Sequence, residues 1–309
     1  MIDICFVILN YNLYEETMEC VASIREKIDT KNYDIIIVDN ASPNGTGNAL
    51  QEIYSKDDDV ELIQLTKNIG FAKGNNVGIK RARDKGATFI CCINDDAKLI
   101  SEDFFTIIRK KYDLYQPALI GPKILDAEGH VDQYNHPLKS ITEYEQQLAF
   151  LSDKSYIDNK MKVTPKMRIR RFIDHQKVLR FIYRAIKVRC FGIDPYEEVK
   201  PKYIDDTLDL VLQGSCYVFT PLFFEKLGGF NEATFLYCEE EFLQADLRII
   251  GLHSLYTPDL TVFHKGGAAT ETISGKNSRK KLEFHRQHDI ESHVQFIKYL
   301  KTHEKEIYG

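Results

Sequence analysis

The stretch that decides the fold is Phe89-Ile90-Cys91-Cys92-Ile93, followed directly by Asn94-Asp95-Asp96. A short apolar run of this kind is typical of a strand buried on both faces, as in a parallel sheet. Two adjacent carboxylates at its end repel each other and need a cation or a solvated loop. Because ligands bind at the carboxyl ends of strands in open α/β sheets, the stretch predicts a site at that edge.

Similar apolar runs alternate with amphipathic stretches before this strand. The alternation predicts right-handed crossovers and a Rossmann-like α/β fold, with a mostly parallel central sheet flanked by helices. The predicted strands are 4–9, 34–38, 60–65 and 89–93, and the predicted helices between them are 15–27, 46–54 and 71–85.

The pattern changes after residue 133, where strand signals become rare, and it resumes near residue 208. The last third predicts strand character over 208–220, helices over 221–227 and 238–250, a short strand over 260–263 and a long amphipathic helix over 276–307.

Composition is ordinary for a soluble globular protein, with 43% hydrophobic and 28% charged residues in 309. No apolar run approaches the length that spans a bilayer, and the chain enters its first strand without a basic leader. The seven cysteines include no Cys-x-x-Cys pair, which favours reduced thiols in a cytosolic protein. We therefore expect a cytoplasmic location.

Charge is unevenly distributed. Residues 160–189 hold eleven Lys or Arg and one acid, so this stretch carries +10 and the remainder −5 − 10 = −15. Between the basic residues lie apolar ones, a pattern typical of an amphipathic segment on an anionic membrane surface. A solvated basic helix or an oligomer contact explains the charge as well. No nucleic-acid recognition motif accompanies it, so nucleic acid is not an expected partner.

The other strand ends are also polar. Asn10-Tyr11-Asn12 follows the first strand, and the second ends at Asp39. Asn68-Ile69-Gly70-Phe71 and Asn75 follow the third. Such residues make turns, but four polar loops on one edge favour a crevice for a nucleotide.

Two further features carry chemistry. Glu239-Glu240-Glu241 follows a run of aromatic residues, which favours a carboxylate tuned as a general base at a pocket wall. The dipole of a helix start favours the same acids without any catalysis. His264, at a strand end before two glycines, is a candidate ligand to metal or phosphate, or a structural histidine.

Taken together, these motifs resemble family-2 glycosyltransferases of the GT-A type, in particular their bacterial rhamnosyltransferase-like branch. The resemblance covers residues 2–133 and 208–270. It rests on Val7–Asn12, Val38–Ser42, Asn68–Ala72 with Asn75, Asn94–Asp96, Gly121–Lys123, Gly214-Ser215, Gly228–Glu232, Phe235–Glu240 and His264.

The resemblance implies a role for each motif. Asp39 contacts the nucleobase, and Asp96 binds Mn²⁺ or Mg²⁺ on the donor diphosphate, with His264 near it. Glu240, beside Glu239, is the base that deprotonates the acceptor hydroxyl, and a single displacement inverts the anomeric carbon. The implied nucleotide-sugar-binding residues are Asn10, Tyr11, Asn12, Asp39, Asn68, Gly70, Phe71, Asn75, Asn94, Asp95 and Gly214.

This chain departs from the family pattern in several places. The metal motif starts with Asn94 rather than Asp, and the presumed base Glu240 is one methylene longer than the usual Asp. Asp246 stands where the family often has Arg. The chain has no Trp and so lacks the Gln-x-x-Arg-Trp motif of processive synthases, which favours single additions.

We therefore expect a GT-A fold with a basic, largely helical insert and a C-terminal helix. Residues 1–133 form the nucleotide-sugar-binding half, 134–207 the insert, 208–275 the acceptor and catalytic half, and 276–309 the helix. The expected function is transfer of a sugar from a UDP- or dTDP-sugar to a glycan or lipid-linked acceptor. The setting is bacterial cell-surface polysaccharide or capsule synthesis, at the inner face of the plasma membrane.

Two other functions compete with this one. A nucleotidyltransferase that makes sugar nucleotides would need a Gly-rich basic loop after the first strand, where Asn10-Tyr11-Asn12 stands instead. A non-catalytic carbohydrate-binding protein on the same fold would have no need of acids at both Asp95-Asp96 and Glu239-Glu240.

Overall fold

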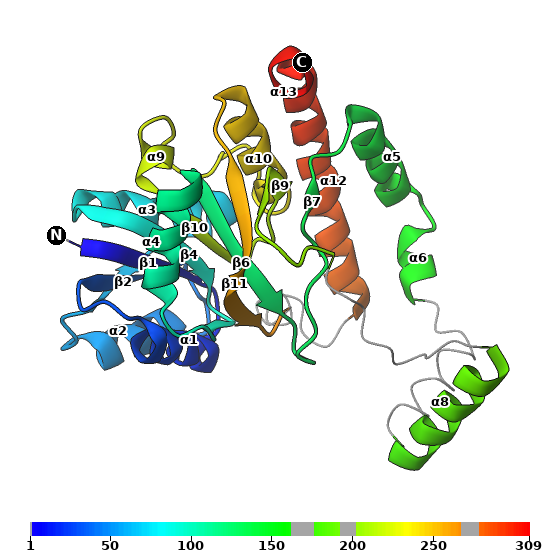
Figure 1. Cartoon of the computed structure of the whole chain (residues 1–309), viewed down its shortest axis with the longest axis horizontal. Helices are drawn as coiled ribbons and strands as arrows, with labels where there is room; N and C mark the ends of the chain where they lie inside the picture. The colour runs from blue at the N-terminus through cyan, green and yellow to red at the C-terminus, as the bar shows by residue number, and fades with distance from the viewer. Residues whose placement is uncertain (1, 162–175, 192–201, 267–277) are drawn as a thin grey trace. The chain divides into compact units, whose positions relative to one another are not determined.

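The structure is a computed structural model that describes residues 2–161, 176–191, 202–266 and 278–309 (Figure 1). The chain divides into two compact units, one made of residues 1–151 with 201–309 and the other of residues 152–200. The predicted insert includes the second unit, and its residues 162–175 and 192–201 lie outside the described part. The finer boundaries at 133, 207 and 275 stay predictions.

A nine-stranded mixed sheet organises the first unit, in the order β3-β2-β1-β4-β10-β6-β11-β5, with β8 paired to β11. Strands β1 to β4 run parallel, whereas β10 is antiparallel to β4 and β6. The strands of the sheet are β1 (Ile2–Asn10), β2 (Tyr33–Asp39), β3 (Val60–Gln64), β4 (Ala87–Asn94), β5 (Ala97–Leu99), β6 (Leu119–Leu125), β8 (Thr207–Leu208), β10 (Cys216–Phe219) and β11 (Ser254–His264). A separate pair joins β7 (His136–Pro137) to β9 (Leu210–Val211).

Helices cover both faces of this sheet. In the first unit they are α1 (Tyr14–Lys27), α2 (Thr46–Tyr54), α3 (Phe71–Asp84), α4 (Phe104–Tyr115), α5 (Ile141–Ser152), α9 (Pro221–Phe224), α10 (Glu239–Ile249), α12 (Ser278–Thr302) and α13 (Glu304–Tyr308). The described helices of the second unit are α6 (Tyr156–Met161) and α8 (Lys177–Phe191). None of the helices in the described ranges has both the length and the apolar character needed to cross a bilayer.

The central strands are apolar on both sides because each face is buried. Along β1, Phe6 and Ile8 pack in a core with α1, α2 and α4, whereas Cys5 and Val7 pack in a second core with α3 and α10. This alternation follows from the two-residue period of a strand. The predicted α/β class with a mostly parallel central sheet is thus confirmed.

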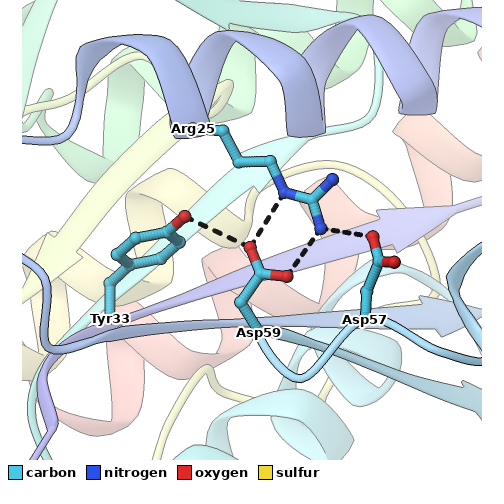
Figure 2. A network of polar contacts seen from close by, with 4 residues as sticks. All are labelled: Arg25, Tyr33, Asp57 and Asp59. Atoms are coloured by element: carbon cyan, nitrogen blue, oxygen red, sulfur yellow. Dashed lines mark hydrogen bonds and ion pairs between the residues drawn. The ribbon is translucent and has the colours of Figure 1, made fainter.

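An ion-pair network ties α1 to the turn that enters β3 (Figure 2). The Arg25 guanidinium donates to Asp59 at 2.8 and 2.6 Å and to Asp57 at 2.5 Å. Asp59 also accepts from the Tyr33 hydroxyl at 3.1 Å. Charge-assisted hydrogen bonds from a forked guanidinium fix the orientation of the groups that they join. The network therefore fixes the orientation of α1 at the sheet edge.

A third core joins α10 to the C-terminal helices. Phe242 of α10 packs on Phe296 of α12 with ring centroids 4.8 Å apart. Tyr144 of α5 also packs on Phe296, with ring centroids 5.0 Å apart. Helix α10 is therefore held between the sheet on one side and α12 on the other.

Several elements differ from expectation. The strand predicted over 260–263 begins at Ser254, because residues 254–257 pair with β6 and β8 before a register shift between Thr257 and Thr261. Strand character over 208–220 is split into short pieces, since Asp209 adopts a left-handed backbone (φ 61°). The predicted helix 276–307 is interrupted at His303, and residues 276–277 lie outside the described part.

Candidate functional site

The polar ends of β1, β2 and β4 lie together because these strands are adjacent and parallel. Register pairs Asn10 with Asp39 and Leu9 with Asn94. The predicted residues at these ends therefore share one edge of the sheet, at the centre of the first unit.

Asp39 is only 4% exposed and has a full set of partners. Its carboxylate accepts from the Asn10 amide at 2.8 Å and from the Ser42 backbone and hydroxyl at 3.2 and 2.5 Å. A Cβ atom at Gly47 would lie 2.5 Å from Asp39 Oδ2, so the helix start there has to be glycine. Asp39 is thus fixed in one orientation before any ligand binds.

The turn after β1 shares these partners. The Asn10 side-chain oxygen Oδ1 accepts from the Thr17 hydroxyl at 3.0 Å, and the Asn12 backbone N–H donates to Ser42 Oγ at 2.9 Å. Asn12 adopts a left-handed backbone (φ 66°), and its buried Oδ1 has no partner among the described residues. Asn10 thus positions Asp39, while Asn12 retains an acceptor for a ligand group.

Ser42 was not predicted as a site residue, although it hydrogen-bonds both to Asn12 in the turn after β1 and to Asp39 at the end of β2. It lies three residues after Asp39, a spacing at which a hydroxyl commonly bonds to a nearby aspartate. Asn40 was missed as well. Its side chain joins the β3–α3 loop by bonds to Asn68 Oδ1 at 3.0 Å and from the Ile69 backbone N–H at 2.9 Å.

The loop from Asn68 to Phe71 also meets a distant part of the chain. The Phe71 N–H donates to the Phe235 carbonyl at 2.9 Å, and Gly70 has a positive φ of 90°. A side chain at Gly70 would collide with the Phe235 backbone. Asn75, predicted to contact the nucleotide, is buried and donates to the Phe71 carbonyl of its own helix at 3.1 Å.

The acidic motif and His264 come together although they are far apart in sequence. Antiparallel pairing of β5 with β11 sets His264 opposite Ala97, so His264 Nε2 lies 3.1 Å from Asp96 Oδ1. The Asn94 amide lies 3.4 Å from the same nitrogen. Asp95 accepts from the Tyr11 N–H at 3.1 Å, and burial together with the charge of Asp96 raises the pKa of Asp95 well above its usual value.

These groups fit a hard divalent cation. Buried carboxylate oxygens such as those of Asp95 and Asp96 are the donors that Mg²⁺ and Mn²⁺ prefer, and His264 Nε2 beside Asp96 offers a further ligand atom. Asp126, Glu128 and His130 form another cluster, on a surface turn. There Asp126 Oδ1 already accepts from the backbone N–H groups of the other two, which explains the cluster as a turn.

The three glutamates start α10 from a strained turn. Tyr237 and Cys238, which directly precede them, both have left-handed backbones (φ 76° and 64°). Such conformations cost on the order of 1–3 kcal/mol each in residues other than glycine, and they cluster at functional sites.

Each glutamate has a different environment. Glu239 is 5% exposed, its Oε1 has no partner in the described part of the chain, and burial raises its pKa to about 7. Glu240 is half-buried, and burial with the two neighbouring charges raises its pKa well above the usual value. Glu241 accepts from the Tyr134 hydroxyl at 3.3 Å.

Glu240 and the acidic motif are linked through one short segment. Glu240 Oε1 lies against the Cα of Gly214, where a side chain would collide with it. The next residue, Ser215, accepts from the Asn94 N–H at 2.9 Å through its carbonyl. Gly214, predicted to bind the nucleotide sugar, therefore makes room for the carboxylate, and the two acidic groups lie on the same edge of the sheet.

The fold is that of GT-A glycosyltransferases. A mannosyltransferase from Pyrobaculum calidifontis, solved with GDP-Man and Mn²⁺, is similar with a TM-score of 0.53, 14% identity and coverage of 96% of this chain and 64% of that one. GalNAc-T7, solved with UDP, GalNAc and Mn²⁺, is similar with a TM-score of 0.55, 12% identity and coverage of 98% and 57%.

Sequence comparison gives the family. The profile of glycosyl transferase family 2 matches residues 5–179, more than half of the chain, and the chain belongs to that family. A low-salt glycan biosynthesis hexosyltransferase, Agl10 of Haloferax volcanii, is 24% identical over 242 residues. That match covers 77% of this chain and 59% of the relative, so the chain spans less than two thirds of the relative's length.

Proposed function

We propose that this protein is an inverting, metal-dependent glycosyltransferase. It would move a sugar from a nucleotide diphosphate donor to a hydroxyl group of a glycan or lipid-linked acceptor. The observation that carries the proposal is the pairing of two carboxylate groups on one sheet edge, Asp95–Asp96 with His264 and Glu240 behind Gly214. The mannosyl- and hexosyltransferase names of similar proteins support a hexosyl donor, and a rhamnosyl donor is the related alternative.

The donor half of the site is rigid. Asp39, fixed by Asn10 and Ser42, would receive the nucleobase, and the free Oδ1 of Asn12 would accept from the base or the ribose. Asp96 with His264 would hold Mn²⁺ or Mg²⁺, which supplies charge neutralisation to the leaving diphosphate. Asp95, held by the Tyr11 N–H, would support the same site from behind.

Glu240 would perform the proton transfer. Its raised pKa makes its carboxylate a stronger base than an exposed glutamate, as general-base catalysis near neutral pH requires. It would take the proton of the acceptor hydroxyl while that oxygen forms a bond to the anomeric carbon. The bond from that carbon to the diphosphate breaks on the opposite side, so the configuration inverts.

A nucleotide screen followed by product analysis tests this function. The protein is heated with UDP, dTDP or GDP, with and without Mn²⁺, and the matching sugar donor is then incubated with hydroxyl acceptors. By mass action, a preferred nucleotide at 100 times its dissociation constant adds about 2.7 kcal/mol to stability. Proton NMR of the first product should show the inverted anomer. A retained anomer, or stabilisation by no nucleotide, would contradict the proposal.

A membrane surface is the proposed setting for the acceptor. Helix α8 exposes Phe181 (73%), Ile182 and Ile186, and the last two, four residues apart, share one side of the helix. Arg184 and Lys187, three residues apart, share another side, and Phe181 lies between the two sides. Basic and apolar faces on one helix match an anionic lipid surface, at the cytoplasmic face in this proposal. The part of the basic stretch over 162–175 lies outside the described residues.

Vesicle sedimentation tests this surface. The protein should pellet with vesicles that contain anionic lipid and stay in solution with purely zwitterionic ones. Phe181→Asp with Ile186→Asp should abolish pelleting, whereas Phe150→Asp, which alters an exposed aromatic residue of the first unit, should not. Equal pelleting of all three proteins would remove α8 from this role.

A further inference from the structure

Helix α12 lies against the segment that leads into the three glutamates. Four consecutive residues of that segment, 235–238, each contact a different side chain of the helix. The Phe235 ring stacks on His288 with centroids 5.0 Å apart, the Leu236 carbonyl accepts from Ser292 at 2.6 Å, the Tyr237 hydroxyl bonds to His285, and Cys238 Sγ lies 3.6 Å from His293 Nδ1.

The spacing of these helix residues explains how they reach one segment. Positions three and four apart share one face of a helix, and His285, His288 and Ser292 follow that spacing. Phe296 continues the same face and is fully buried against Phe242 of α10. Packing of Phe296 therefore fixes the register in which the three histidines and the serine meet the segment.

The segment needs such support. Tyr237 and Cys238 hold left-handed backbones, which persist only where the surroundings over-determine them. On its other side, the Phe235 carbonyl accepts from the Phe71 N–H, next to Gly70 in the β3–α3 loop. The segment is thus held between α12 and the loop that is predicted to bind the nucleotide.

We infer that His285, His288, Ser292 and His293 of α12 are positioning residues that hold the strained segment 235–238 and thereby aim Glu240 at the acceptor hydroxyl. The inference rests on the proposed function for its catalytic consequence. The clamp itself, meaning these four contacts, is a property of the fold and is tested separately from activity.

Kinetics test the catalytic consequence. His288→Ala removes the stacked ring and Ser292→Ala the bond to Leu236, while His288→Phe keeps a flat ring on Phe235. Gln295→Ala, on the exposed side of α12, is the matched control. A small misplacement of a catalytic group can cost about 100-fold in rate, so we expect kcat to fall about 10- to 100-fold in both clamp variants. The donor KM should stay within about two-fold, as befits an interaction that acts on the chemical step.

The conservative variant separates positioning from general loss of structure. His288→Phe should recover most of the kcat that His288→Ala loses, and Gln295→Ala should match the wild type. Unchanged kcat in both clamp variants would overturn the inference, as would equal damage in His288→Phe and His288→Ala. Absence of glycosyl transfer by the wild type would instead contradict the proposed function.

Hydrogen exchange tests the clamp whether or not the protein is active. In the full chain, the backbone amides of residues 235–241 should exchange at least about ten-fold faster in His288→Ala and Ser292→Ala than in the wild type. Gln295→Ala should leave them unchanged. Exchange rates that do not move in either clamp variant would show that α12 does not hold the segment.

Discussion

Asp95–Asp96 and Glu239–Glu241 are both runs of adjacent carboxylates, yet their neighbours differ. The aspartates face donors, since Tyr11 N–H contacts Asp95 and His264 contacts Asp96. Among the glutamates, Glu241 accepts from the Tyr134 hydroxyl, whereas Glu239 is buried and its Oε1 has no partner among the described residues. Acids surrounded by ligand-type groups suit a cation, whereas acids whose pKa is raised by burial suit proton transfer. Neighbours therefore decide the chemistry more than residue type does.

The largest expected effect comes from removing the proposed cation ligand. Asp96→Ala should abolish turnover, with a loss of roughly 10⁴-fold, because several kcal/mol of charge stabilisation at the leaving group disappear. Calorimetry should also show that Mn²⁺ no longer strengthens nucleotide binding. Asp96→Asn keeps the shape without the charge and serves as the matched variant. Full turnover in either variant would break the contrast between the two acidic runs.

Removing the proposed base should affect chemistry and not binding. Glu240→Gln keeps the size of the side chain but not its basicity, so kcat should fall by roughly 10²–10⁴. Donor affinity, measured by calorimetry, should be unchanged. Glu240→Asp keeps a carboxylate on a shorter stem and should retain more activity than the glutamine variant. Loss of donor affinity in Glu240→Gln would assign the residue to the donor site instead.

The burial of Glu239 should be detectable in the pH dependence of stability. Burial raises the pKa of Glu239 from 4.5 to about 7, so between these values the unfolded chain ionises while the folded one keeps its proton. The free energy of unfolding should therefore fall as pH rises from about 4.5 to 7. The raised pKa of Glu239 accounts for a loss on the order of 3 kcal/mol. Glu239→Gln should stabilise the protein at pH 8 and leave it nearly unchanged at pH 4. Denaturant unfolding measures both, and equal effects at the two pH values would contradict the raised pKa.

The smallest effect is expected at a third group of acids, which bind a cationic side chain of the protein itself. Asp57 and Asp59 bind Arg25 at the surface, with the Arg25 side chain about a third exposed. Arg25→Ala should cost about 1 kcal/mol of unfolding free energy, less at high salt, and leave kcat unchanged. Lys56→Ala, an exposed neighbour, is the control. A change in metal-dependent activity in Arg25→Ala would show that this pair is not separate from the site.

Much of the proposed donor half could be predicted from the sequence. Parallel strands buried on both faces leave continuous apolar runs, so Phe89–Ile93 and its polar end were recognisable, and strand adjacency followed from the crossovers. The meeting of His264 with Asp96 could not be derived from periodicity. It depends on antiparallel pairing of the three-residue strand β5 with β11, and so short a strand leaves no readable pattern.

The proposed catalytic half was harder to predict for a similar reason. The acids at 239–241 were visible, but their environment is set by Gly214, by a left-handed turn at Tyr237 and by a helix that begins about forty residues later. Left-handed backbones in an aromatic residue run against local preference, so tertiary contacts alone explain them. The histidines of α12 likewise carried no signal of their own until the fold placed them against residues 235–238.

The position of the second unit, between the two parts of the first unit, has a consequence for how the sequence of this protein can vary. Residues 152–200 are one continuous stretch of the chain, and the named strands of the central sheet lie before or after it. The free-energy cost of closing a loop rises only slowly with its length. This stretch can therefore lengthen, shorten or change its charge without disturbing the register of β4 or β11. Under the proposed function, the membrane contact of α8 can then diversify while the positions of Asp39, Asp96 and Glu240 stay fixed.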